Sequence, residues 1–457
     1  MPPSFGTSGL RGLVTDLTPA LVTDHVRAFA ASCPMGTGLF VGHDLRASSP
    51  AIAATVAAAG QAAGLAVTLC GAVPTPALAL DAMRAGAAAV MVTGSHIPAD
   101  RNGLKFYTPE GEITKAHETA ILDALGQDRA DLAGPAPQSA DVGRAYQDRY
   151  LQAFGTVLSG LRLGLYAHSA VGRDLTADLL RGLGATVVML GRSDTFVPVD
   201  TEAVDPQIRT QLAIWARAHG VAAILSTDGD GDRPLMTDET GRIMPGDIMG
   251  QITAACLAAQ HLVTPISSNS GADAAGFAKV LRTRIGSPHV IAGMQALGGK
   301  VVGYEANGGF LLGFDAQGPA GPLPALMTRD AMLPMLTVLT AATGAPLSRL
   351  VAAQPARVTA ADRLQNVPIQ TSAALVAALT DDPQRRAGFL ESLDLAERTV
   401  DLTDGLRITC MDGRIVHLRP SGNAPELRLY IEADSPDRAE STLNAGLARL
   451  RHVLMNA

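Results

Sequence analysis

Aromatic residues and cysteines are scarce in this sequence. Phe, Trp and Tyr make up 4% of the 457 residues, whereas 47% are hydrophobic and 47 residues are glycine. This apolar content excludes a disordered chain, and abundant glycine with few aromatics fits an α/β protein with many turns. The cysteines have no paired spacing, which favours a reducing, cytoplasmic setting. They are Cys33, Cys70, Cys256 and Cys410.

Positive charge is also in short supply. A net charge of −7 argues against a nucleic-acid-binding surface, so an anionic substrate would need a local cluster of Arg and Lys. Residues 47–80 carry no charge, but they are rich in alanine and interrupted by proline. We therefore expect a buried helix over 51–63 and a strand over 66–70 there, and no membrane span. The start, Pro2-Pro3, lacks the basic-then-apolar pattern of a signal segment.

Short apolar segments alternate with helical ones along most of the chain, and each ends in polar residues. Continuous apolar strands between helices indicate parallel sheets covered on both faces, and ligands collect where such strands end. The polar endings include Asp44-Leu45-Arg46, Thr93-Gly94-Ser95 and Ser226-Thr227-Asp228. The expected strands are 38–42, 87–92, 161–166, 186–190 and 221–225.

A Pro/Gly linker at 134–138 follows the first of three units of similar length, and the stretches 240–245 and 346–355 follow the second and the third. The last hundred residues differ, because strands over 399–409, 415–418 and 427–432 precede a helix that begins near Ser435. The sequence therefore predicts three similar α/β domains with mixed, mainly parallel sheets and a C-terminal α+β domain. The predicted domains are 1–139, 140–243, 244–353 and 354–457.

Three carboxylates alternate with glycine in Asp228-Gly-Asp230-Gly-Asp232-Arg233, directly after a predicted strand. Oxygen ligands on so flexible a backbone can converge on Mg²⁺ or Ca²⁺, but do not suit Zn²⁺. A helix–loop–helix Ca²⁺ site is disfavoured because Arg233 stands where its sixth-position glycine is needed. The alternative is an acidic, solvated turn.

A second motif, Thr93-Gly94-Ser95-His96, places a serine on a tight turn at the end of a strand. A serine hydroxyl needs a base or charge partner to act as a nucleophile, and His96 and Lys105 are close enough in sequence to serve. The alternative is that Ser95 caps a helix. No GxSxG elbow is present, which disfavours a hydrolase.

Three further segments offer groups for a phosphosugar. The loop Arg419-Pro420-Ser421-Gly422-Asn423, followed by Arg428, carries donors for phosphate oxygens. Glu305 and Asn307 are spaced to meet neighbouring sugar hydroxyls from an extended loop. The segment 6–12 is glycine-rich and contains Arg11, without the lysine of a nucleotide P-loop. Each of these three could also be an ordinary turn or a flexible start.

Taken in order, these five segments resemble the α-D-phosphohexomutase superfamily over nearly the whole chain, and they look most like bacterial phosphomannomutases. The resemblance implies four domains around one cleft, with Ser95 as a phosphoserine. It implies that Asp228, Asp230, Asp232 and the phosphoserine hold one Mg²⁺ per chain. The residues expected to contact the transferred phosphoryl group are Arg11, His96, Lys105 and Arg233. Those expected to bind the sugar are Glu305 and Asn307. Those expected to bind the phosphate that does not react are Arg419, Ser421, Gly422, Asn423 and Arg428.

The implied activity interconverts hexose 1-phosphate and hexose 6-phosphate through a hexose 1,6-bisphosphate, in a monomer or homodimer. Three departures from the usual family pattern, at Ile97, at Asn307 with Gly309, and at 423–425, bear on the sugar. Mannose phosphates are the first expectation, and glucose or glucosamine phosphates are the alternatives. Two other classes stay open: a phosphatase that uses Asp228 as nucleophile, and a non-catalytic phosphosugar-binding protein.

Overall fold

The computed structural model describes residues 3–6, 9–342, 344–421 and 425–455. The chain forms two compact units. The first contains Met1–Leu262 and Gly286–Val351, and the second contains Val263–Ile285 and Ala352–Ala457. Among the described helices, none combines the length and the apolar character that crossing a membrane requires.

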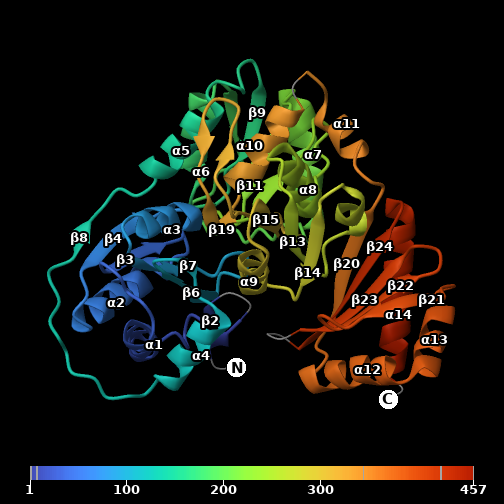
Figure 1. Cartoon of the computed structure of the whole chain (residues 1–457), viewed down its shortest axis with the longest axis horizontal. Coiled ribbons are helices and arrows are strands. Elements are labelled where there is room, and N and C mark those ends of the chain that lie inside the picture. The colour runs from blue at the N-terminus through green and yellow to red at the C-terminus, as the bar shows by residue number, and fades with distance from the viewer. Residues whose placement is uncertain (1–2, 7–8, 343, 422–424, 456–457) are drawn as a thin grey trace. The chain divides into compact units, whose positions relative to one another are not determined.

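The first sheet has eight strands and is mixed (Figure 1). In the order β1-β2-β6-β5-β3-β4-β8, β3 runs parallel to β4 and β5, while β6 is antiparallel to β5 and β2. The strands are β1 (Ser4–Phe5), β2 (Leu10–Leu13), β3 (Leu39–His43), β4 (Val67–Ala72), β5 (Ala88–Val92), β6 (Arg101–Thr108), β7 (Gly111–Glu112), which pairs with β6, and β8 (Gln138–Ser139).

Helices cover both faces of this sheet, as an odd-numbered and an even-numbered residue of β3 show. A Cβ on Gly60 in α2 would meet Leu39, whereas a Cβ on Gly42 would meet Leu78 in α3. Because odd and even strand positions point to opposite faces, α2 and α3 lie on opposite sides. The helices are α1 (Pro19–Ser32), α2 (Ser49–Ala62), α3 (Thr75–Arg84) and α4 (Lys115–Asp123). The uncharged stretch 47–80 thus forms α2, β4 and the start of α3.

The second sheet has the order β10-β9-β11-β12, with β9 parallel to β10 and β11. Every residue of β11 is buried, as expected for a strand covered on both faces. Its strands are β9 (Arg162–Tyr166), β10 (Thr186–Leu190), β11 (Ala223–Thr227) and β12 (Pro234–Met236), and its helices are α5 (Arg144–Phe154), α6 (Arg173–Gly182) and α7 (Pro206–His219).

A third set of strands in the first unit is antiparallel: β16 pairs with both β15 and β19. The predicted linker at 346–355 is partly wrong, because Pro346 precedes a short helix whose first residue, Leu347, is buried. The elements are α8 (Gly246–Cys256), α9 (Ser287–Leu297), β15 (Val301–Tyr304), β16 (Phe310–Leu312), β17 (Ala316–Gln317), β18 (Pro322–Leu323), β19 (Leu326–Asp330), α10 (Met332–Ala341) and α11 (Leu347–Ala352).

The second unit centres on a five-stranded antiparallel sheet, β20-β24-β23-β22-β21 (Figure 1). The predicted single strand over 399–409 is wrong: it is two strands, because Gly405 with φ +79° turns the chain between them. The elements are β20 (Val358–Gln365), α12 (Ile369–Asp381), α13 (Pro383–Glu391), β21 (Glu397–Asp401), β22 (Leu406–Cys410), β23 (Ile415–Pro420), β24 (Glu426–Ala433) and α14 (Pro436–Met455), preceded in the chain by β13 (His261–Pro265), η1 (Ser270–Ala274) and β14 (Lys279–Thr283).

The helix expected near Ser435 is confirmed as α14, and Leu443, Leu447 and Leu450 on one of its faces are buried against this sheet. The predicted fold class is therefore confirmed: the first unit contains mixed sheets with helices, and the second contains an antiparallel sheet with helices.

Candidate functional site

Ser95 lies in the tight connection between β5 and β6, with its side chain buried. Its φ of +53° is unusual for a residue other than glycine. Its hydroxyl donates to Asp228 Oδ2 at 2.5 Å, which joins the serine loop to the loop after β11. No helix begins at Ser95, so the helix-cap alternative is wrong.

The three aspartates of the β11–β12 loop converge as the sequence predicted. Asp228, Asp230 and Asp232 are completely buried, and one oxygen of each lies within 4.8 Å of the others. A solvated acidic turn is thereby excluded. Burial, and then repulsion from Asp230 and Asp232, raise the pKa of Asp228 well above its usual range.

Lys105, on β6, supplies positive charge to this cluster. Its Nζ donates to Asp230 Oδ2 at 2.5 Å and to Asp232 Oδ2 at 2.6 Å. Burial acts to raise the pKa of Asp230, but the charge and hydrogen bond of Lys105 outweigh it, so that pKa falls below its usual range. Thr75, the first residue of α3, also donates to Asp230 Oδ2, at 2.7 Å.

The donor set suits a hard divalent cation. Asp230 and Asp232 each keep one buried oxygen, Oδ1, that has no hydrogen-bond partner among the residues described. An unpaired buried carboxylate oxygen is costly unless a cation meets it. With three carboxylates and no nitrogen or sulfur ligand in the cluster, the residues fit Mg²⁺.

Arginine and histidine side chains surround the serine and the aspartates. Arg233 Nη1 donates to His96 Nδ1 at 2.7 Å, and His96 Nδ1 lies 3.4 Å from Ser95 Oγ. Burial and the nearby cations Arg233 and Arg11 lower the pKa of His96 well below its usual range. Arg11, on β2, is held beside Lys105 because its register partner on β6 is Gly103. Burial lowers the pKa of Arg11 to about 10.

Glu305, in the predicted sugar loop, is connected to the aspartates through Arg329, a residue that the sequence did not single out. Arg329, on β19, is fully buried and pairs with Asp232 Oδ2 at 3.1 Å and with Glu305 Oε2 at 3.6 Å. Asn307 Oδ1 accepts from the amide of Gly309 at 3.0 Å, so this side chain also fixes its own turn. Arg329 therefore connects the metal loop to Glu305.

The phosphate loop predicted at 419–423 belongs to the second unit, and Gly422 and Asn423 lie outside the described residues. Arg419 Nε pairs with Asp404 Oδ1 at 3.0 Å. Arg419 on β23 faces Arg428 on β24, which faces Arg363 on β20, so three arginines form one cross-strand row. Glu426 pairs with Arg363 at 3.4 Å and with Arg428 at 3.5 Å, so two carboxylates accompany the three arginines. The row keeps a net positive charge, and because like charges directly opposite repel, it favours a bound anion. Arg363 is a member that the sequence did not reveal.

The structure thus brings together seven predicted residues: Arg11, Ser95, His96, Lys105, Asp228, Asp230 and Asp232, with Arg233 and Glu305 joined to them through ion pairs or hydrogen bonds. Thr75 and Arg329 were missed, because neither lies in a glycine-rich or acidic motif. Asp238, outside the cluster, accepts from Thr240 and Arg242 in the next turn.

Comparison with known protein families gives a match along almost the entire chain. The matching families are described as phosphoglucomutase/phosphomannomutase alpha/beta/alpha domain I at residues 2–131, domain II at 145–241, domain III at 245–358, and the C-terminal domain at 356–447.

Full-length relatives agree with this match. The chain is 46% identical to a phosphomannomutase of Sinorhizobium fredii, over 98% of this chain and 99% of that protein. It is 44% identical to a phosphomannomutase of Salmonella muenchen, over 99% and 97%. Among solved structures, a phosphoglucomutase/phosphomannomutase family protein from Burkholderia thailandensis has the same fold, with a TM-score of 0.80 at 21% identity over 98% of this chain and 97% of that one.

Proposed function

This chain belongs to the phosphoglucomutase/phosphomannomutase family, and from that premise we propose that it interconverts mannose 1-phosphate and mannose 6-phosphate through a phosphorylated Ser95. It is an enzyme of the phosphohexomutase type. The mannose assignment draws on the two phosphomannomutases at 44–46% identity. Glucose and glucosamine phosphates are the alternative substrates.

The observation that carries this proposal is the 2.5 Å contact between Ser95 Oγ and Asp228 Oδ2. The proposal is supported because Asp228 belongs to a cluster of three buried carboxylates, which Lys105 also contacts, and because Arg233 donates to His96 beside the serine. A phosphoserine adds about −1.5 to −2 charges, which only a site rich in cations tolerates. When bound to the aspartates, Mg²⁺ would offset charge on the transferred phosphoryl group.

In the first step, a sugar hydroxyl attacks the phosphorus of phospho-Ser95. The new bond joins the sugar oxygen to phosphorus, and the bond between phosphorus and Ser95 Oγ breaks, which gives a hexose 1,6-bisphosphate. The hydroxyl proton passes to a protein base, and the departing Ser95 Oγ takes up a proton in return; His96 and Lys105 are the two candidates for this proton handling. Arg11 and Arg233 would stabilise the charge spread over the phosphoryl oxygens.

In the second step, Ser95 takes the other phosphoryl group from the bisphosphate. The bisphosphate must turn around between the steps, so groups that bind either orientation are required. We assign sugar binding to Glu305 and Asn307, and phosphate binding to Arg419, Ser421, Gly422, Asn423 and Arg428. Binding energy from these remote contacts would position the reacting hydroxyl.

Replacement of the serine tests the scheme directly. Ser95→Ala should abolish interconversion and remove a phosphate-sized mass from the intact protein, because no hydroxyl is left to carry the group. Chelation of Mg²⁺ should stop the wild-type reaction. A Ser95→Ala protein with wild-type turnover would refute the mechanism.

The rival classes make different products. A phosphatase with Asp228 as nucleophile would release inorganic phosphate from the sugar phosphate, and a sensor protein would bind without turnover. The contact of Asp228 with the Ser95 hydroxyl favours the mutase, since a nucleophilic aspartate would need no serine there. Comparison of kcat/KM for mannose, glucose and glucosamine 1-phosphates identifies the sugar.

We also propose a cytoplasmic location, and a monomer or homodimer with no nucleic-acid or membrane partner. The net charge of −7 supports the absence of a nucleic-acid surface. Light scattering of the purified protein would measure its oligomeric state, and cell fractionation would test its location.

A further inference from the structure

Arg46 lies in the loop after β3, and its side chain contacts the loop that carries Ser95. The mechanism above gives Arg46 no role. Its side chain is 1% exposed, and its guanidinium donates to four main-chain carbonyls of the connection between β5 and β6. The acceptors are Ser95 O at 3.0 Å, Ile97 O at 2.5 Å, Pro98 O at 2.6 Å and Arg101 O at 2.8 Å.

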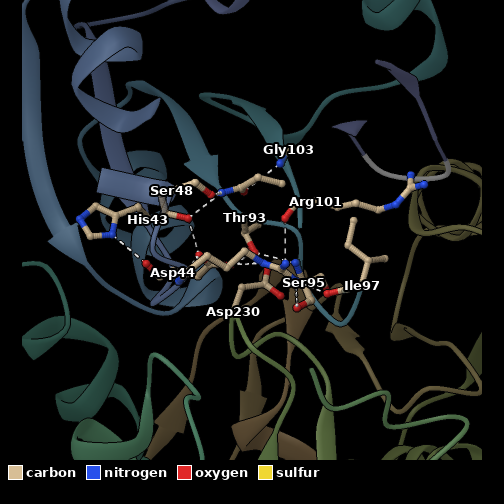
Figure 2. Close-up of polar contacts among 12 residues, drawn as sticks. His43, Asp44, Ser48, Thr93, Ser95, Ile97, Arg101, Gly103 and Asp230 are labelled. Atoms are coloured by element: carbon tan, nitrogen blue, oxygen red, sulfur yellow. Dashed lines mark hydrogen bonds and ion pairs between the residues drawn. The ribbon is translucent and has the colours of Figure 1, made fainter. Parts of the chain in front are cut away.

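A buried carboxylate orients this guanidinium. Asp44 Oδ2 pairs with Arg46 Nε at 3.2 Å and accepts from Thr93 Oγ1 at 2.7 Å. The same Thr93 oxygen accepts from the amide of Ser95 at 2.7 Å, so Thr93 lies between Asp44 and Ser95 (Figure 2). Asp44 Oδ1 accepts from Ser49 Oγ at 2.5 Å. The amide and the carbonyl of Ser95 are therefore both fixed by this network.

Packing holds the guanidinium plane from its two sides. A Cβ on Gly94 would lie 2.5 Å from Arg46 Cζ, so a glycine is needed for the loop to approach so closely. The ring of Phe196 lies over the guanidinium, with its centroid 4.0 Å from Cζ. A cation against an aromatic face in a desolvated site is stabilised by the charge distribution of the ring.

The backbone of Ser95 explains why so many contacts are needed. Its φ of +53° is a strained conformation that persists only when the surroundings determine it. We propose that Arg46 is the positioning residue that holds Ser95 in this conformation, so that the hydroxyl stays directed at Asp228. This inference rests on the proposed function, because it assigns Arg46 a part in phosphoryl transfer by Ser95.

The role differs from ordinary stabilisation of the fold. All four carbonyls belong to the seven-residue segment 95–101 that begins with the nucleophile. Without the guanidinium, Pro98 O keeps only its bond from the Arg101 amide at 3.1 Å, the Ser95 and Ile97 carbonyls lose the donor described above, and the loop can relax toward negative φ at Ser95. A displacement of about 1 Å in a reacting group costs about 100-fold in rate.

The test compares Arg46→Met with the conservative Arg46→Lys and with a matched control, Arg181→Met. Arg181 on α6 is half-exposed and pairs with Asp178. Each protein is phosphorylated with mannose 1,6-bisphosphate, its phosphoserine content is read by intact mass, and transfer to mannose 6-phosphate is followed in a single turnover. Melting temperature is measured in parallel.

For Arg46→Met we expect a fall of about 10- to 100-fold in single-turnover rate and in kcat, with KM within about twofold of wild type. Arg46→Lys should recover part of the rate because an ammonium can satisfy some of the carbonyls, and Arg181→Met should match wild type. A folded Arg46→Met protein with the wild-type single-turnover rate would overturn the positioning role.

Two milder variants decide the question if Arg46→Met does not fold. Phe196→Leu removes the ring from the guanidinium, and Thr93→Val removes the link between Asp44 and the Ser95 amide. Both should lower the single-turnover rate with KM unchanged, and wild-type rates in both would reject the inference. Failure of the proposed function is distinguishable, since the wild-type protein itself would then show no mutase activity.

Discussion

Thr75→Val should weaken Mg²⁺ binding without unfolding the protein. Thr75 is completely buried at the start of α3, where its Oγ1 donates to Asp230 Oδ2 at 2.7 Å. Asp230 Oδ2 also accepts from Lys105 Nζ at 2.5 Å, which leaves Oδ1 as the oxygen free to meet a cation. Thr75 thus fixes which oxygen of Asp230 is presented to the metal.

The size of the effect follows from the charge on the acceptor. A hydrogen bond to a charged group contributes about 1.5–3 kcal/mol, and about 1.4 kcal/mol corresponds to a tenfold change in an equilibrium constant. The Mg²⁺ concentration for half-maximal activity should therefore rise by about 10- to 100-fold, as is typical when a group that orients a metal ligand is lost. Valine has nearly the same shape, and the main-chain bond from Thr75 to Asp230 O at 2.9 Å remains.

The assay is mutase activity as a function of Mg²⁺ for wild type, Thr75→Val, Thr75→Ser and Thr119→Val. Serine keeps the hydroxyl and should restore the wild-type value, and Thr119 on α4 is an exposed control threonine. Direct Mn²⁺ binding, measured by electron paramagnetic resonance, separates affinity from turnover. If the Mg²⁺ concentration for half-maximal activity is unchanged in Thr75→Val, the reasoning is refuted. If Thr75→Ser behaves like Thr75→Val, the effect comes from packing and not from the hydroxyl.

Three other predictions concern separate parts of the molecule. Arg363→Met should raise KM for the sugar phosphate by about tenfold with kcat unchanged in steady-state assays, because it removes one charge from the arginine row. Tyr146→Phe should lower the free energy of unfolding by about 1.5–3 kcal/mol in urea titrations, because its hydroxyl donates to buried Asp330 at 2.5 Å. Burial lowers the pKa of His417 to about 4, and its Nδ1 is buried with no partner among the described residues, so the unfolded chain binds the proton more readily. The free energy of unfolding should therefore be independent of this group above about pH 6.5 and should fall by up to about 3 kcal/mol as the pH falls toward about 4. His417→Gln should remove this pH dependence.

The positions of Ser95 and of the aspartate loop, each at the end of an apolar strand, could be predicted from the sequence. Their convergence was implied only by the resemblance, because β5 and β11 belong to different sheets. The strands that precede both motifs, β5 and β11, were expected within two residues of their observed bounds. Mixed α/β architecture followed from the same alternation of apolar strands and helices. These features are local in sequence, so single-chain patterns reveal them.

The parts that were missed depend on pairing between distant segments. Strand β6 was not among the expected strands, yet it carries Lys105, and its pairing of Gly103 with Arg11 on β2 puts Arg11 and Lys105 on one face of the sheet. Arg329 lies in a strand, Leu326–Asp330, that contains no glycine-rich or acidic motif, and its contacts with Asp232 and Glu305 appear only after folding. The division of 399–409 into two strands turns on one glycine within a polar run, where periodicity carries little information.

The conformation of Ser95 has a consequence for the choice of nucleophile. Threonine offers the same hydroxyl, but its branched Cβ is poorly compatible with a left-handed backbone. With φ at +53°, this position accommodates serine and disfavours threonine, although the two hydroxyls react alike with phosphorus. In the proposed mechanism, the identity of the phosphate carrier is therefore set by the geometry of the main chain as much as by reactivity.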